Sequence, residues 1–190
     1  YAHFCAAYFE GAFKKRTLGF IFDGTGYGDD GRIWGGEILR GDLKSYERVG
    51  HFESFKLINS DVKNIRNLAL SVILHYDLKE EATEFLNKIP SIKLRNLEKI
   101  YENSTLYTSS LGRIIDAFGS IVFDLTHSSY EAQIGLMCEK MYDDRLNFSY
   151  KLRFKNGQID FREVFLGALK DEASRAVTGF FNALANFMLE

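Results

Sequence analysis

The chain has few cysteines, a single proline and no long apolar run. Its two cysteines, Cys5 and Cys138, do not lie in a C-x-x-C pair. This excludes a zinc ribbon and a disulfide scaffold, so we expect a reducing, cytoplasmic setting. No apolar run approaches the roughly 18 residues that a membrane span needs, and no signal-peptide pattern opens the chain. We therefore expect no membrane partner.

An excess of charge of either sign is also missing. The 24 basic and 26 acidic residues give a net charge of −2. Nucleic-acid-binding proteins usually present a basic face, and the sequence predicts none here. We expect no nucleic-acid partner. With 190 residues, 46% of them hydrophobic, the chain is long and apolar enough to bury a core.

The pattern of apolar residues divides the chain into a β-rich part, residues 1–56, and a mainly helical part, residues 57–190. In the first part we expect a helix over 2–13, with Phe4, Ala7 and Tyr8 on one face, followed by strands over 18–22, 34–40 and 46–52. The chain starts within one helical pattern and ends within another. We interpret it as a piece of a longer polypeptide and hence as an incomplete domain.

In the second part, Asp61 is expected to cap a first helix, and Ser128 or Ser129 to cap a helix over 130–142. A β-hairpin near 148–161 turns at Asn156-Gly157. The remaining helices are predicted over 78–88, 93–103 and 109–123, and over 162–189 as one long or broken helix.

A glycine-rich segment at residues 22–37 combines an apolar strand, a turn and several carboxylates. Asp23 follows the strand directly, and glycines at 24, 26 and 28 follow Asp23. Glycine allows positive φ and close approach of backbone N–H groups to an oxyanion, and an aspartate at such a turn is placed to bind a cation. The alternative of equal weight is a plain β-hairpin in which residues 18–22 pair with residues 32–39.

Three common loop types do not match this segment. A dinucleotide-binding loop needs G-x-G-x-x-G before a helix, but these glycines follow G-x-G-x-G and precede a strand. A Walker A loop needs a lysine, and none occurs between residues 16 and 43. A calcium loop starting at Asp23 would need glutamate at position 34, which is Trp34.

Five blocks in order make the chain similar to the HypF family of hydrogenase maturation carbamoyltransferases. They are Tyr1-Ala2-His3, residues 22–37, Glu47-Arg48-Val49, residues 108–113 with Asp116-Ala117, and residues 129–133. The resemblance implies an α/β fold of the actin/Hsp70/sugar-kinase type. It also implies an ATP-dependent enzyme that moves a carbamoyl group from carbamoyl phosphate, through carbamoyl-adenylate, to the C-terminal cysteine of a HypE-like acceptor protein.

The resemblance also assigns site residues, although it leaves the catalytic residues unknown. His3 and Asp23 match two ligands of a divalent metal, zinc or iron; the other two ligands are expected outside residues 1–190. Gly24, Thr25 and Gly26 match positions that hold phosphate or carbamoyl oxygens. The expected nucleotide-binding residues are Ser109, Ser110, Gly112, Asp116 and Glu131.

Some roles stay open. Asp116 is equally compatible with a surface acid at a helix start, and Glu37 with either a brace for the glycine-rich segment or a solvated acid. The sequence departs from the family at Asn59-Ser60-Asp61, at Ala132 and at Phe180-Phe181-Asn182. The alternative functions are a small-molecule O-carbamoyltransferase of the same fold and a non-catalytic nucleotide- or partner-binding module.

Overall fold

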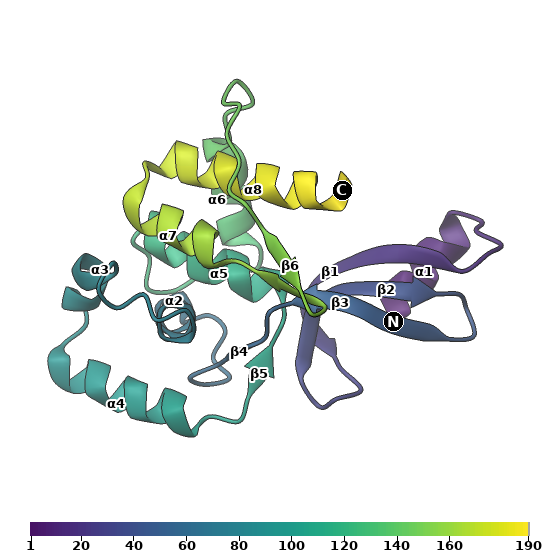
Figure 1. Cartoon of the computed structure of the whole chain (residues 1–190). Helices are drawn as coiled ribbons and strands as arrows, with labels where there is room; N and C mark the ends of the chain where they lie inside the picture. The colour runs from purple at the N-terminus through teal and green to yellow at the C-terminus, as the bar shows by residue number, and fades with distance from the viewer. Residues whose placement is uncertain (190) are drawn as a thin grey trace.

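A computed structural model describes residues 1–189, in which a mixed β-sheet packs against helices (Figure 1). The sheet order is β4-β5-β2-β3-β7-β6, and β1 pairs with β2 outside this path. The β1-β2 and β2-β3 pairs are antiparallel, whereas β2-β5 and β3-β7 are parallel. The strands are β1 (Thr17–Tyr27), β2 (Ile33–Gly41), β3 (Tyr46–Phe52), β4 (Phe55–Lys56), β5 (Tyr107–Thr108), β6 (Arg153–Lys155) and β7 (Gln158–Asp160).

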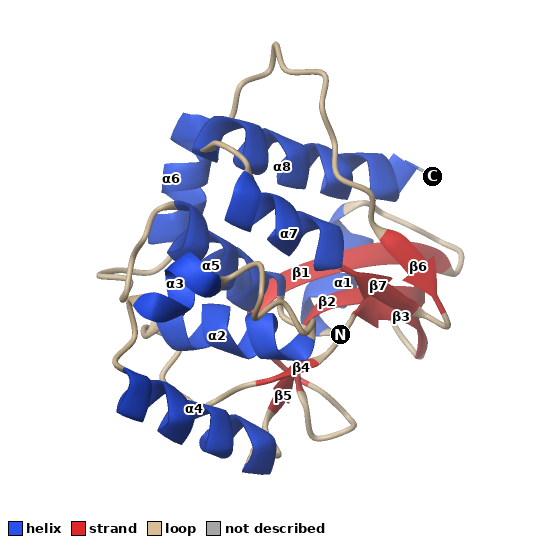
Figure 2. Cartoon of the chain, turned by 60° about the vertical axis from the view of Figure 1, so that its left-hand side comes forward, coloured by secondary structure: helices blue, strands red, loops and turns tan. Residues whose placement is uncertain are grey.

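The helices lie on both faces of this sheet, but unequally (Figure 2). Most of them gather on one face, and the first helix lies on the other. None of the helices within residues 1–189 is both long enough and apolar enough to cross a membrane. They are α1 (Ala2–Glu10), α2 (Ile65–His75), α3 (Thr83–Asn87), α4 (Ser91–Asn103), α5 (Leu111–Val122), α6 (Gln133–Met141), α7 (Arg162–Lys170) and α8 (Ala173–Leu189).

Strand β2 separates a large core from a small one. Neighbouring residues of a strand point to opposite faces, so Ile38 joins the large core and Leu39 the small one. Phe4 and Tyr8 of α1 complete the small core together with Trp34. The fully buried phenylalanines of the large core lie at positions 52, 118, 161, 165 and 180. The sheet is therefore covered on both faces where the glycine-rich segment crosses it.

Several predicted elements are confirmed. Strand β3 has the predicted bounds, and residues 18–22 pair with β2 as the hairpin alternative required. Asn156 and Gly157 both have positive φ, as a two-residue hairpin turn needs. The closing helix is broken into α7 and α8. On α1, Phe4 and Tyr8 are buried as predicted, but Ala7 is exposed.

The glycine-rich segment departs from its prediction. Strand β1 does not stop at Asp23 but continues to Tyr27, with a register shift between Phe22 and Gly26. In this segment only Gly31 has positive φ. The glycines at 26 and 28 instead allow Trp34 of β2 to pack closely against β1, because a Cβ at either position would crowd that residue. Close strand packing, rather than an unusual backbone, explains them.

Three predicted helix starts are wrong. Asn64, and not Asp61, caps α2 by accepting a hydrogen bond from the Asn67 N–H (3.2 Å), because Asp61 is engaged in a turn with the Lys63 N–H. Helix α3 covers only Thr83–Asn87 of the predicted 78–88. Helix α6 starts at Gln133 after Ala132 in the left-handed conformation, with no serine cap.

Candidate functional site

The carboxylate of Asp23 is oriented by the backbone that follows it. Its Oδ1 accepts hydrogen bonds from the N–H groups of Gly24 (2.6 Å) and Thr25 (3.4 Å). Its Oδ2 lies 3.5 Å from Nδ1 of His3, a largely exposed side chain on α1. The structure thus brings the two predicted metal ligands together from separate elements.

Helix α1 is held in place so that His3 faces Asp23. Phe4 and Tyr8 pack into the small core, and the ring of Tyr1 stacks on Tyr46 of β3 with a centroid distance of 4.4 Å. The position of His3 therefore depends on apolar packing of the residues around it.

The separation of these two donor atoms fits a shared metal ion. Zinc is bound at about 2.0 to 2.2 Å in tetrahedral geometry, which places two ligand atoms about 3.4 Å apart. The observed 3.5 Å agrees with this, and an imidazole with a carboxylate suits zinc or iron. Within residues 1–189 no three His, Cys, Asp or Glu side chains cluster as a metal site. His3 and Asp23 can thus supply two ligands of a larger set.

The segment that leads into α5 lies directly against the glycine-rich segment. Ser110 caps α5, accepting a hydrogen bond from the Arg113 N–H (3.2 Å), and its hydroxyl lies within 2.9 Å of the carbonyl oxygens of Asp23 and Gly24. A Cβ on Gly112 would lie 2.8 Å from the Cα of Gly24. This contact requires glycine at 112 and sets the distance between the two segments.

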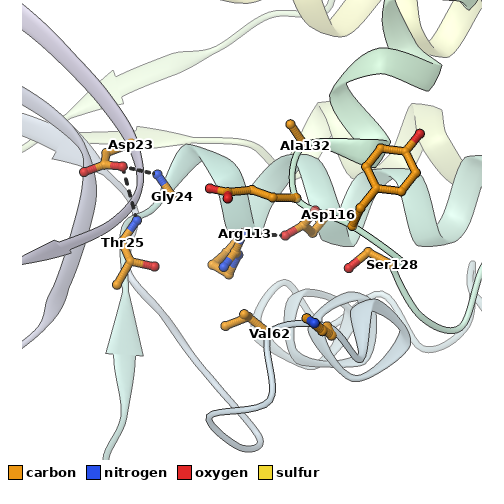
Figure 3. Close-up of a pocket in the computed structure, with 11 residues that line it drawn as sticks. Asp23, Gly24, Thr25, Val62, Arg113, Asp116, Ser128 and Ala132 are labelled. Carbon is orange, nitrogen blue, oxygen red and sulfur yellow. Dashed lines mark hydrogen bonds and ion pairs between the residues drawn. The ribbon is translucent and has the colours of Figure 1, made fainter.

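A cavity of about 430 Å³ opens beside this contact (Figure 3). It joins the glycine-rich segment to the loop before α2, the first turns of α5 and the loop before α6. Five of the predicted site residues line it: Asp23, Gly24, Thr25, Asp116 and Glu131. The other lining residues are Val62, Lys63, Arg113, Ser128, Tyr130 and Ala132.

An ion pair lies inside the cavity. Arg113 Nη2 and Asp116 Oδ2 are 2.6 Å apart, and both side chains are 15% exposed. Burial raises the pKa of Asp116, and the neighbouring Arg113 opposes that rise. The alternative of an exposed surface acid at position 116 is therefore wrong. Sequence reasoning missed Arg113 and Lys63 as lining residues, although an arginine three residues before an aspartate on a predicted helix is a signal for pairing.

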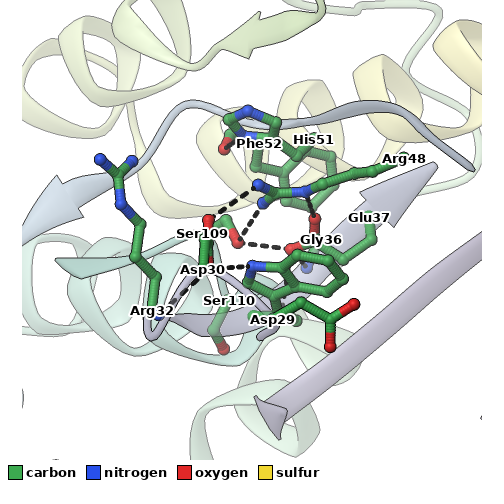
Figure 4. A network of polar contacts seen from close by, with 12 residues as sticks. Asp29, Asp30, Arg32, Gly36, Glu37, Arg48, His51, Phe52, Ser109 and Ser110 are labelled. Atoms are coloured by element: carbon green, nitrogen blue, oxygen red, sulfur yellow. Dashed lines mark hydrogen bonds and ion pairs between the residues drawn. The ribbon is translucent and has the colours of Figure 1, made fainter. Parts of the chain in front are cut away.

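A second polar cluster surrounds Glu37, which is 2% exposed (Figure 4). Its carboxylate accepts hydrogen bonds from the N–H groups of Gly35 (3.2 Å) and Gly36 (3.3 Å), from the Arg48 Nε–H and from the Ser109 hydroxyl. Glu37 therefore braces the glycine-rich segment, and the solvated alternative is wrong.

Arg48 links this cluster to the hairpin turn. Its Nη1 lies 3.3 Å from Oδ2 of Asp30, and its guanidinium lies 4.2 Å above the ring of Trp34. The Trp34 indole N–H donates to Oδ1 of Asp30 (2.8 Å). The hydroxyls of Ser109 and Ser110 are buried in such internal bonds, and their direct contact with a nucleotide stays a prediction, as do the roles of Gly26 and Gly112.

Comparison with known proteins agrees with this arrangement. The family described as carbamoyltransferase, Kae1-like domain, second subdomain, matches residues 19–190. The chain belongs to this family. It is thus a HypF C-terminal fragment of the predicted α/β class, and its fold is that of HypF structures.

Two carbamoyltransferases HypF illustrate the relation. The one from Synechocystis sp. is 27% identical over all of this chain and 28% of its own length. The one from Rhodobacter capsulatus is 32% identical over 76% of this chain and 20% of its own length. The chain thus spans about a quarter of its relatives.

Solved structures give the same picture. A crystal structure of full-length HypF in the phosphate- and nucleotide-bound form matches with a TM-score of 0.88 at 29% identity, over 98% of this chain and 26% of that one. The crystal structure of T. kodakarensis HypF matches with a TM-score of 0.72 at 21% identity, over 90% of this chain and 25% of that one, and supports the fold.

Proposed function

We propose that the chain is part of a carbamoyltransferase that acts in nickel–iron hydrogenase maturation. The observation that carries the proposal is the cavity where Asp23, Gly24, Thr25, Asp116 and Glu131 meet in a chain of the HypF family. The matching full-length HypF was crystallised with phosphate and nucleotide. This supports ATP, carbamoyl phosphate and carbamoyl-adenylate as occupants of the cavity.

In the proposed reaction carbamoyl phosphate is cleaved to carbamate and phosphate, and a carbamate oxygen attacks the α-phosphorus of ATP and displaces pyrophosphate. The carbamoyl group of the resulting carbamoyl-adenylate then passes to the C-terminal cysteine of a HypE-like acceptor. The acceptor thiolate attacks the carbamoyl carbon, and AMP leaves with the electron pair. The chain's residues bind and orient the adenylate. The N–H groups of Gly24 and Thr25 already donate to Asp23, so we assign the anionic ligand to other donors that line the cavity, among them the Thr25 hydroxyl, Lys63 and Arg113.

His3 Nδ1 and Asp23 Oδ2 would hold a divalent cation, zinc or iron, beside the cavity. When bound, such an ion supplies positive charge that polarises a phosphate or acyl oxygen. The role of Asp23 depends on its orientation, which the Gly24 and Thr25 N–H groups set.

The test is carbamoylation of the acceptor cysteine by the full-length polypeptide supplied with ATP and carbamoyl phosphate. Asp23→Ala is expected to lower the rate at least about 100-fold, as loss of a metal or electrostatic contact at the reacting group does, and to lower the content of bound metal. Asp144→Ala, at an exposed loop position, is the matched control and should leave both unchanged.

Full carbamoylation by Asp23→Ala would contradict the proposal. Carbamoylation of a small-molecule hydroxyl, but not of the cysteine, would support the O-carbamoyltransferase alternative. Binding of nucleotide without turnover would support a non-catalytic module.

A further inference from the structure

We propose that Arg113 is the anion-binding residue of the cavity and that Asp116 competes with the anion for it. Entry of an anionic ligand then exchanges one ion pair for another. This inference rests on the proposed function, since it assigns the residue that takes the phosphate group of that ligand.

The position of Arg113 is the first support. It lies in the first turn of α5, and its Nη2 is 2.6 Å from Asp116 Oδ2 on one side. On the other side the same nitrogen is 4.0 Å from the place where a Cβ of Gly24 would lie. Figure 3 shows the guanidinium between the Gly24–Thr25 segment and Asp116. A ligand that fills the cavity beside Gly24 meets Arg113.

The unused donors of Arg113 are the second support. A guanidinium carries five N–H donors in a planar fork. Within residues 1–189, Asp116 is the carboxylate paired with Arg113, and the buried Nε has no hydrogen-bond partner. A buried donor without an acceptor is unfavourable, and an oxyanion can accept from Nε and Nη together. The geometry favours phosphate over a neutral ligand.

The charges that line the cavity are the third support. Asp23, Asp116 and Glu131 are acidic, whereas Lys63 and Arg113 are basic. While Arg113 is paired with Asp116, the carboxylates of Asp23 and Glu131 repel an anion that enters the cavity. Lys63 is then the one lining cation that makes no ion pair within residues 1–189. Phosphate affinity therefore depends on how readily Asp116 gives up Arg113.

Titration calorimetry of the full-length polypeptide with inorganic phosphate, and separately with ADP, tests this competition. Asp116→Asn removes the competing charge and should tighten phosphate binding about 3- to 10-fold. Arg113→Gln should weaken binding of both ligands at least about 10-fold. The difference between wild type and Arg113→Gln isolates this cavity from any other phosphate site.

Two further variants secure the outcome. Arg113→Gln leaves Asp116 partly buried and unpaired, which can unfold the chain, so the double variant Arg113→Gln with Asp116→Asn removes both charges and should still bind phosphate at least about 10-fold more weakly. The pair Arg145–Asp143, also joined by a nitrogen–oxygen contact of 2.8 Å, lies on an exposed loop. Its variants Asp143→Asn and Arg145→Gln should leave both affinities unchanged.

Two results would contradict the proposed competition, provided that wild type binds both ligands. In one, Asp116→Asn does not tighten phosphate binding; in the other, Arg113→Gln keeps the wild-type affinity. In either case the proposed function stands. If wild type binds neither phosphate nor ADP, the competition and the proposed function both fall.

Discussion

Two polar regions lie on either side of the segment that enters α5, and they differ in how fully their groups are paired. Around Glu37, each carboxylate oxygen accepts at least one hydrogen bond, and Glu37 itself is buried (Figure 4). In the cavity, a buried N–H of Arg113 has no hydrogen-bond partner among residues 1–189 (Figure 3). Fully paired polar groups hold a structure rigid, whereas unpaired ones are free to bind. The first region is a scaffold, and the second is the place for a ligand.

The aspartates of the two regions show the same contrast. For Asp30, burial raises the pKa, but hydrogen bonds from the Arg32 N–H and the Trp34 indole, together with Arg48, outweigh it and lower the net pKa. For Asp116, burial prevails over Arg113, and the pKa is raised. The surroundings of Asp30 thus stabilise its charged carboxylate, whereas those of Asp116 favour the neutral carboxyl group.

Removing Glu37 should have the largest effect on stability. Glu37→Ala leaves Arg48 and two backbone N–H groups without a buried acceptor, and we expect a loss of about 3 to 5 kcal/mol in the free energy of unfolding, measured in urea. Glu47→Ala, which breaks the exposed pair with Arg40, should change it little. Equal losses for the two variants would show that the cluster is no scaffold.

A methyl group at Gly36 should come next. Its Cβ would collide with the Phe52 ring and the Ser109 carbonyl oxygen, and overpacking of this kind lowers stability by about 1 to 3 kcal/mol. Gly135→Ala on α6 is the control, because outside its own helix backbone no atom of residues 1–189 lies within 4 Å of its Cβ position. That variant should match or exceed wild type in the same unfolding measurement. A neutral Gly36→Ala contradicts the close contact.

Ser110→Ala should cost about 1 to 2 kcal/mol, since it removes both the cap of α5 and the bond to the glycine-rich segment. Thermal and urea unfolding measure the loss. The exposed Ser129 provides a matched substitution to alanine that should have no effect. If Ser110→Ala lowers the free energy of unfolding no more than Ser129→Ala does, Ser110 does not hold the glycine-rich segment against α5.

The smallest effect is a pH dependence of opposite sign in the two regions. Asp30 stabilises the fold above its ordinary pKa of 3.8, and this is lost as the pH falls through its lowered pKa. Protonated Asp116 stabilises the fold below 3.8, and this is lost as the pH rises through its raised pKa. We therefore expect the difference in the free energy of unfolding between wild type and Asp30→Asn to be smaller at about pH 3 than at about pH 7. Urea unfolding at the two pH values measures it.

Over the same range, wild type should gain stability relative to Asp116→Asn as the pH falls. If the free energies of unfolding of the two variants change with pH in the same direction relative to wild type, the pKa values of Asp30 and Asp116 are not shifted in opposite directions.

Local chemistry was sufficient to predict much of the fold. The apolar run at 18–22, the glycines after Asp23 and the run after Trp34 gave the β1-β2 hairpin as one of two interpretations of equal weight, and the structure contains it. The Asn156-Gly157 pair predicted the turn of the β6-β7 hairpin. The helix starts failed where two polar residues competed for one role, as with Asp61 and Asn64. Such choices depend on which side chain reaches a free N–H, and spacing alone does not decide that.

The sequence by itself determined the family and the order of most elements, although not the short strands β4 and β5. The tertiary structure decided which residues share the cavity, because residues 23–25 meet residues 128–132 only after the chain has folded back on itself. It also decided that Ser109 faces the scaffold while Asp116 faces the cavity. Burial and pairing arise from long-range packing, and they separate the scaffold from the site.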